Sequence, residues 1–160
     1  MRTLAILAIT ASASFGAHAT DLPTFEQYAL HNIYHGKPAP VRLSSHPQAK
    51  TFRTVLRDGE KGGPNFAGHY TVVTFGCGIS CLRLAIVDAR NGNVFFPPQT
   101  QPNSYFMVTD QSPPYEYRLD SELLILTGAP QDKDNEGIYY YRWDGKRLRQ
   151  LAYVAKKWWR

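Results

Sequence analysis

Two cysteines are the residues of this 160-residue chain whose spacing most directly predicts a chemical feature. Cys77 and Cys81 are separated by Gly78-Ile79-Ser80, and the chain has no other cysteine. In an exported protein two such neighbours oxidise to each other, so we expect a disulfide that closes a short loop. Three intervening residues differ from the C-x-x-C of redox enzymes, and no second pair completes a zinc site. The loop therefore serves to fix local shape, and Gly78, Ile79 and Ser80 are candidate binding residues.

Ser80 also belongs to a segment, Gly78-Ile79-Ser80-Cys81-Leu82, that begins like the G-x-S-x-G elbow of serine hydrolases. The final glycine of that motif is absent here. The elbow also requires a turn from a strand into a helix, whereas Ser80 is expected between two strands. Hydrogen bonding within the loop is therefore the preferred interpretation of this hydroxyl, and we assign no catalytic residue.

His69 is the histidine best placed for proton transfer, because its unperturbed pKa of about 6.5 suits a general base at neutral pH. A partner acid is not evident beside it in the sequence. The fold would have to bring Asp88, Asp110 or Asp120 to the imidazole. The alternative that we favour is a partly buried histidine that is hydrogen-bonded under the turn at residues 63–68.

Two further patterns are compatible with metal binding, and each has a simpler interpretation. His31 and His35 stand four residues apart at the end of a predicted helix, but no third ligand is recognisable, and they suit the helix C-terminal dipole. Residues 132–137 place oxygens at positions one, three and five and glycine at six, as a calcium loop does. Trp143 occupies the twelfth position, where a glutamate is needed, so a polar turn is preferred. We expect no metal and no cofactor.

Aromatic and basic side chains crowd the last strands. Tyr141, Arg142 and Trp143 are candidate binding residues, because Tyr, Trp and Arg are favoured at contact sites and on sugar-stacking surfaces. Trp158 and Trp159 either pack against the helices or contact a partner. The chain has a net charge of +5, and residues 142–160 carry seven basic side chains against one acidic. In an exported protein this basic end does not indicate nucleic acid, whereas lipid head groups, a glycan or an envelope protein fit it. The simpler interpretation, which we favour, is a solvated final strand and tail that keeps the protein in solution.

The first residues predict export. Arg2 is followed by an apolar run at residues 4–9 and by the small-residue site Ala17-His18-Ala19, the pattern of a signal peptide cleaved after Ala19. The apolar run is too short for a transmembrane segment. We therefore expect a signal peptide at residues 1–19 and one secreted, β-rich domain at residues 20–160, located in the periplasm or outside the cell.

Periodicity predicts an α+β fold, an antiparallel β meander or curved sheet of about eight short strands with two N-terminal helices. The helices are expected at residues 24–34 and about 46–57. The strands are expected at residues 70–75, 82–87, 94–96, 104–108, 115–119, 123–127, 138–141 and 148–154. Asp144-Gly145 is expected to turn the last pair of strands.

Four motifs carry a resemblance to known proteins. They are Gly63-Pro64-Asn65-Phe66-Ala67-Gly68-His69-Tyr70, Gly76-Cys77-Gly78-x-x-Cys81, Ile86-Val87-Asp88 and Tyr140-Tyr141-Arg142-Trp143-Asp144-Gly145. Together they resemble a family of uncharacterised secreted bacterial proteins, which implies no activity. Asn65 and His69, within the first motif, are candidate binding residues.

A weaker likeness is to the periplasmic inhibitors of vertebrate-type lysozyme, whose disulfide loop plugs the enzyme's cleft. Those inhibitors have four residues between their cysteines, including a histidine, whereas this chain has Gly78-Ile79-Ser80. The likeness implies a protruding binding element without naming its target. A periplasmic binding or inhibitor-like protein is thus the favoured expectation, without catalytic activity, and the alternative is a hydrolase acting on a cell-wall or glycan substrate. A cleft with convergent titratable groups would favour the hydrolase.

Overall fold

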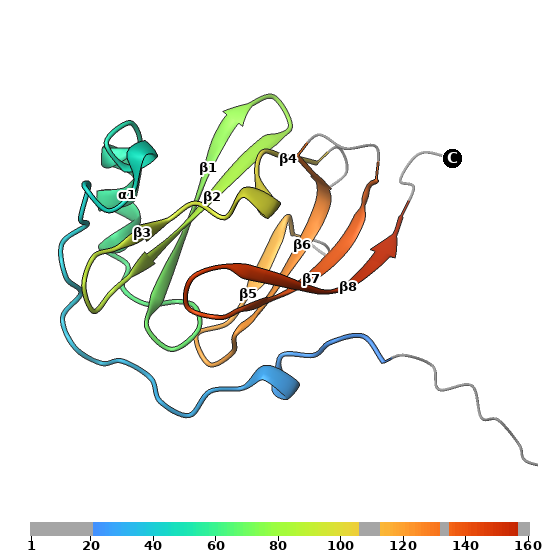
Figure 1. The fold of residues 1–160 in the computed structure, drawn as a ribbon, viewed down its shortest axis with the longest axis horizontal. Helices are drawn as coiled ribbons and strands as arrows, with labels where there is room; N and C mark the ends of the chain where they lie inside the picture. The colour runs from blue at the N-terminus through green and yellow to red at the C-terminus, as the bar shows by residue number, and fades with distance from the viewer. Residues whose placement is uncertain (1–20, 106–112, 132–134, 157–160) are drawn as a thin grey trace, which may run out of the picture.

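The computed structural model describes residues 21–105, 113–131 and 135–156. Within these residues one antiparallel sheet of eight strands has the order β1-β2-β4-β6-β7-β8, with β3 paired to β2 and β5 paired to β6 (Figure 1). The strands are β1 (Tyr70–Gly78), β2 (Cys81–Asp88), β3 (Val94–Phe95), β4 (Asn103–Ser104), β5 (Tyr115–Tyr117), β6 (Leu123–Pro130), β7 (Gly137–Trp143) and β8 (Leu148–Ala155). The prediction of a β-rich fold with about eight antiparallel strands is confirmed.

The sheet changes partners along β6. On one edge of this strand, residues 124–126 pair with β5, whereas Ala129 and Pro130 pair with Ser104 and Asn103 of β4. The opposite edge pairs with β7 along residues 123–128. Gly128 stands at the change with φ +142°, and a Cβ there would collide with the Asn103 side chain. Residues with a side chain rarely adopt this backbone conformation. Glycine at position 128 therefore allows β4 to approach β6 closely. The single β6 strand thereby joins the β1–β4 half of the sheet to the β5–β8 half.

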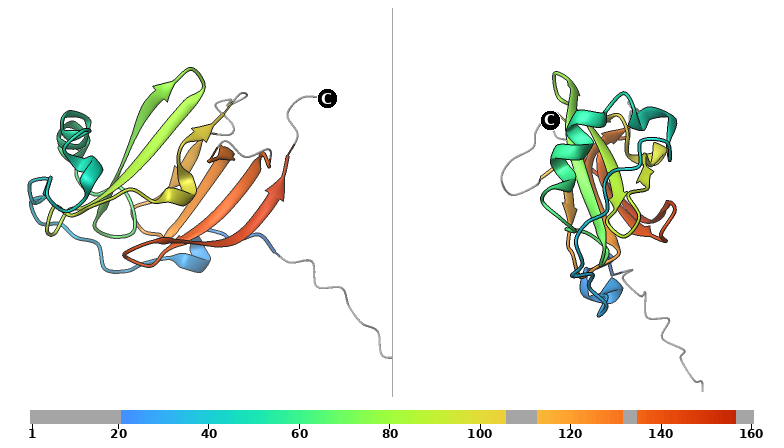
Figure 2. Two further views of the ribbon diagram at one scale, coloured as in Figure 1. Left: turned by 45° about the horizontal axis from the view of Figure 1, so that its top comes forward. Right: turned by 90° about the vertical axis from the view of Figure 1, so that its left-hand side faces the viewer.

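Alternation along β1 and β2 separates two hydrophobic cores, because successive side chains of a strand point to opposite faces. Val72, Leu84 and Ile86 face a central core shared with the β5–β8 half, which includes Leu124, Leu126, Tyr139, Tyr141 and Trp143. Val73, Ala85 and Val87 face a second core under the helix α1 (Arg53–Glu60). Figure 2 shows α1 against the β1–β3 end of the molecule, away from β5–β8.

Only one of the two predicted helices forms within the described residues, and it is shorter than expected. The chain makes a 3₁₀ turn at Pro47–Ala49, and α1 then begins at Arg53. Gly59 is the last residue but one of this helix, which ends at Glu60. The missing side chain of Gly59 leaves room for Val73, which a Cβ would approach within 2.6 Å. The glycine therefore permits close packing of α1 on β1.

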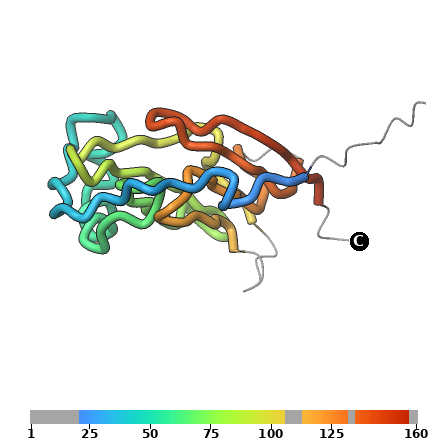
Figure 3. The backbone as a smooth tube through the Cα atoms, turned by 90° about the horizontal axis from the view of Figure 1, so that it is seen from below, coloured from blue at the N-terminus to red at the C-terminus, as the bar shows by residue number. Residues whose placement is uncertain are grey.

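The predicted helix at residues 24–34 is wrong. A single 3₁₀ turn spans Glu26–Tyr28, and Ala29 is already extended. The reason lies in the sheet, since Leu30 N–H donates to Asp120 O and Glu122 N–H donates to Tyr28 O. Helices of this length are marginal by themselves, so backbone bonds to a turn of the sheet prevail. Figure 3 shows this N-terminal segment running along the molecule from the β5–β8 half to the α1 end. None of the helices within the described ranges is long and apolar enough to cross a membrane.

Candidate functional site

The disulfide predicted from the sequence is present. It joins Cys77 to Cys81, with 5.2 Å between the Cα atoms. In the β1–β2 register Gly76 pairs with Leu82 and Gly78 with Cys81, which leaves Cys77 as the extra residue of a β-bulge. The disulfide thus links the bulge of β1 to the first residue of β2. This cross-link and the paired strands hold the hairpin end in one conformation.

Ile79 and Ser80 form the two-residue turn at the tip of this hairpin. Ile79 is fully exposed, with a relative accessibility of 101%. Ser80 has φ +52°, a conformation that non-glycine residues seldom adopt. Its carbonyl accepts a hydrogen bond from the Tyr105 N–H, at 3.0 Å. In Figure 1 the turn rises beyond the other strands, so the structure presents an apolar side chain on a projecting and braced tip. Ser80 lies between two strands, without the helix that a nucleophile elbow requires.

The base of the hairpin rests on the second core. The ring of Phe75, near the end of β1, packs against Phe52 with 4.7 Å between centroids. The guanidinium of Arg83 lies 5.7 Å from the same Phe52 ring. On the other side, Cys81 and Leu82 pair with β4. These contacts from both sides make the tip an extension of the rigid body of the protein.

A separate cleft of about 240 Å³ contains His69 and Trp143, two of the residues predicted from the sequence. His69 immediately precedes β1, and Trp143 ends β7. The other residues that line the cleft come from the N-terminal segment, the start of β1, the β2–β3 turn, the residue before β6 and the β7–β8 turn, namely Leu30, Asn32, Ala67, Tyr70, Arg90, Glu122, Asp144 and Gly145. Distant parts of the sequence therefore bring titratable groups together here.

The imidazole of His69 lies at the wall of this cleft, and its surroundings lower its pKa. Burial lowers its pKa below the ordinary value of 6.5, and the positive charge of Arg90 lowers it further, against the opposing charge of Asp88. The Nε2 atom lies 3.8 Å from Asp88 Oδ1. That oxygen accepts the Arg90 N–H, and the second oxygen accepts from the Asn91 side chain. Asp88 thus caps the β2–β3 turn, and its distance of 3.8 Å from Nε2 is longer than a hydrogen bond to the imidazole.

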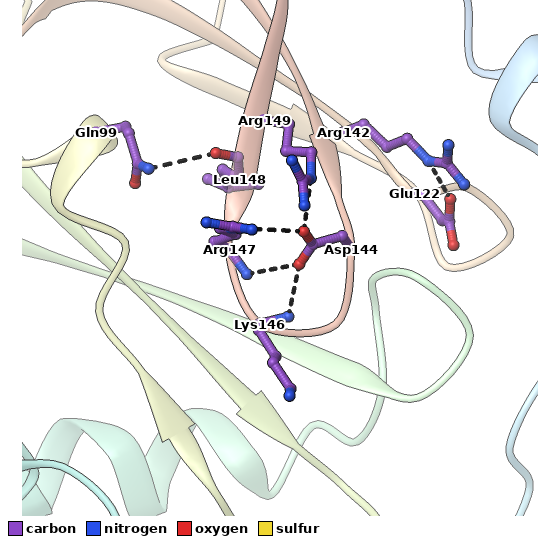
Figure 4. Close-up of polar contacts among 8 residues, drawn as sticks. All are labelled: Gln99, Glu122, Arg142, Asp144, Lys146, Arg147, Leu148 and Arg149. Carbon is purple, nitrogen blue, oxygen red and sulfur yellow. Dashed lines mark hydrogen bonds and ion pairs between the residues drawn. The ribbon is translucent and has the colours of Figure 1, made fainter.

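The remaining acids of the cleft are also engaged in structural contacts (Figure 4). Glu122 accepts a hydrogen bond from Arg142 Nε at 2.7 Å. Asp144 caps the β7–β8 turn, accepting from the backbone N–H groups of Arg147 and Lys146 and from the Arg149 guanidinium. The Arg147 N–H contributes most, followed by the Arg149 side chain, to a pKa for Asp144 of about 2. The cleft therefore brings together an imidazole of lowered pKa and two carboxylates that already accept hydrogen bonds from arginine side chains.

Sequence reasoning missed Arg90, Glu122 and Asp144 as neighbours of His69. The Asp144-Gly145 pair was recognised as a turn signal, and the structure has that turn. Its position beside His69 depends on the pairing of the whole sheet, which no local pattern records. Of the acids proposed for His69, Asp88 lies near it, Asp110 lies outside the described residues, and no ion pair to Asp120 occurs within the described part.

Other candidate residues have identifiable positions. Asn65 hydrogen-bonds the backbone of Val72. Arg142 is exposed and paired with Glu122, and Tyr141 is buried in the central core. His31 and His35 are exposed in a segment without the helix that would have aligned them, and the described residues contain no cluster of three metal-ligating side chains. The calcium-like pattern at 132–137 lies partly, and Trp158 and Trp159 wholly, outside the described residues.

Comparisons with protein-family models, with curated proteins and with solved structures find no match to this chain. The geometry of the two sites is therefore the basis for a functional proposal.

Proposed function

We propose that this protein is a periplasmic, inhibitor-like binding protein that inserts the tip of its disulfide hairpin into a cleft of another protein. The observation that carries the proposal is the complete exposure of Ile79 at the end of a braced hairpin. An isolated apolar side chain on a surface is common. A fully exposed isoleucine at a turn, next to a residue with positive φ, is more informative, because polar residues and glycine suit turns better.

Rigidity supports the same proposal. Binding costs less when the recognition element is already ordered, since little conformational entropy is lost on association. Three features order this tip before any partner arrives, namely the Cys77–Cys81 disulfide, the Tyr105 to Ser80 hydrogen bond and the pairing with β4. A narrow, rigid and apolar tip suits a concave surface such as an enzyme cleft. The predicted signal peptide puts that enzyme in the periplasm or outside the cell.

Capture from a periplasmic extract tests this proposal. Oxidised protein of residues 20–160 serves as bait, beside an Ile79→Asp variant and a Leu22→Asp control. Leu22 is also exposed, at 45%, but lies far along the chain from the hairpin. A partner retained by the wild type and the control, with affinity reduced at least tenfold by Ile79→Asp, is the expected result. Equal retention by all three forms would exclude the tip as the recognition element. If the partner is a hydrolase, the wild type should inhibit it.

A hydrolase acting on a cell-wall or glycan substrate is the second candidate. The cleft that His69, Glu122 and Asp144 line favours it. The contacts that already occupy the carboxylates speak against it. Incubation with peptidoglycan separates the two functions. Soluble fragments released by the wild type and lost in His69→Ala would support the hydrolase, and no release would leave the binding function preferred.

A further inference from the structure

The outer edge of β1 is closed at its start. Among the described residues β1 is the first strand in the order of the sheet, so its only neighbouring strand is β2 (Figure 1). On the side away from β2, the Tyr70 N–H donates to Phe66 O, and the Val72 N–H and C=O pair with the Asn65 carboxamide. Residues 65 and 66 therefore take the place of a neighbouring strand along the first part of β1.

The edge is open farther along β1, toward the hairpin tip. Successive residues of a strand direct their N–H and C=O groups to opposite edges. Because those of Val72 point to the outer edge, those of Thr74 and Gly76 do so too, whereas Val73 and Phe75 face β2. Thr74 and Gly76 are exposed, and no bond from the described residues to their outer backbone groups occurs. This part of the edge thus offers free donors and acceptors in the spacing of a strand.

Gly76 leaves one face of the open edge bare. It does not have a positive φ, and a Cβ at this position would meet no atom within 4 Å. The described fold would therefore accept a side chain here, although glycine weakens a strand. Glycine within a strand often marks a place where another backbone approaches closely. The bare face beside free backbone groups therefore suits an added strand.

The position of this edge on the hairpin indicates what reaches it. On the other side of the hairpin, Cys81 and Leu82 of β2 pair with β4, so that side is closed near the tip. Of the two edges of the hairpin, the β1 edge is therefore the one free to contact a protein that receives Ile79. The open stretch spans only about 10 Å, whereas a stable interface buries about 1,200 Å² or more, so this edge does not hold a second copy by itself.

We propose that the open edge from Thr74 to Gly76 adds one short extended segment from the cleft rim of the protein that receives the hairpin tip. This inference rests on the function proposed above and assigns a second contact to the same partner. Main-chain hydrogen bonds to an added strand give affinity. The side chain of the added strand beside Gly76 is large, because the glycine leaves that space empty.

Hydrogen exchange tests whether the edge is free and whether the partner covers it. The probe is the protein that the oxidised wild-type bait retains from the periplasmic extract. The amides of Thr74 and Gly76 should exchange rapidly in the free protein and slowly in the complex. The Phe75 amide, which faces β2, should be protected in both.

Edge variants test the backbone contact itself. Thr74→Pro removes an outer N–H and should weaken the complex about tenfold, roughly the effect of one hydrogen bond. Gly76→Val, whose Cβ meets no described atom, should fold as the wild type and also weaken the complex by filling the bare face. Gln150→Pro is the matched control at the opposite edge of the sheet. Leu148 O accepts from Gln99 at the outer edge of β8, so the N–H two residues later also points outward, and its loss should leave the affinity unchanged.

The possible results separate this inference from the proposed function. Weakening by Ile79→Asp and by both edge variants would support both. Weakening by Ile79→Asp alone would overturn the edge contact and leave the tip in place, whereas weakening by the edge variants alone would overturn the tip. Slow exchange of Thr74 and Gly76 in the free protein would show that the edge is already covered, by a second copy or by another part of the chain, and would overturn the inference without a partner. Retention of no protein would overturn both proposals.

Discussion

The carboxamide of Asn65 pairs with the backbone of Val72 as a neighbouring strand would. Val72 N–H donates to Asn65 Oδ1 at 2.7 Å, and Asn65 Nδ2 donates to Val72 O at 3.2 Å. An open sheet edge exposes unpaired backbone groups, which favour aggregation. One side chain of the glycine-rich motif thus covers part of the β1 edge, which gives this residue a structural role.

Replacement of this side chain should therefore lower stability. Asn65→Ala removes both hydrogen bonds and leaves a partly buried N–H and C=O unpaired, so we expect a loss of about 1–3 kcal/mol in the free energy of unfolding. Urea denaturation measures it, with the exposed Asn32→Ala as control, expected within about 0.5 kcal/mol of the wild type. A wild-type midpoint for Asn65→Ala would show that solvent satisfies these groups equally well.

Removal of the disulfide should have a modest effect on stability. Cys77 and Cys81 enclose only three residues, and the chain-entropy relation gives about 2 kcal/mol for so short a loop. The Cys77→Ser, Cys81→Ser double variant should unfold at lower urea concentration but keep its fold, because the cores lie elsewhere. A loss larger than about 4 kcal/mol, or a change in far-UV circular dichroism, would mean that the disulfide also organises the sheet.

Local patterns predicted the strands well. β-branched and aromatic runs bounded by Gly, Pro, Asn and Asp located seven of the strands to within a few residues, because strand propensity and turn chemistry are encoded locally. The strand expected at residues 104–108 lies mostly outside the described residues, and β4 there spans Asn103–Ser104. The helix expected at residues 24–34 does not form, because contacts distant in sequence decide the conformation of that segment. Leu30 N–H bonds to Asp120 O, a partner far away in sequence.

Among the candidate sites, too, only the one built from neighbouring residues could be predicted from the sequence. The cysteine spacing predicted the disulfide loop, since a disulfide between near neighbours is a short-range feature. The cleft around His69 could not be predicted, because its walls meet only after β6 has joined the two halves of the sheet. Tyr141 was a candidate binding residue because of its aromatic type. Its position in β7 places it in the central core, where it is buried.

The titration of His69 provides a test of the cleft. Its pKa in the folded protein lies below 6.5, so the unfolded chain binds the proton more tightly. The contribution to stability is complete above about pH 6.5 and is lost as the pH falls through the lower, folded pKa. NMR titration of the imidazole should give a midpoint below 6.5. Arg90→Gln should raise that midpoint and Asp88→Asn should lower it. A midpoint above 6.5 in the wild type would mean that Asp88 dominates.

Asp144 should titrate at a strongly acidic pH. Its folded pKa of about 2 lies below the ordinary value of 3.8, so its stabilising contribution is present above pH 3.8 and is lost as the pH falls through about 2. Carbon-detected NMR of the carboxyl group measures this midpoint directly, free of the other acids. Because Arg149 is the main side-chain donor to this carboxylate, Arg149→Gln should raise the midpoint. The Arg147 and Lys146 N–H groups remain as donors in that variant, so the midpoint should stay below 3.8. An unchanged midpoint would show that the backbone of the turn alone holds the charge.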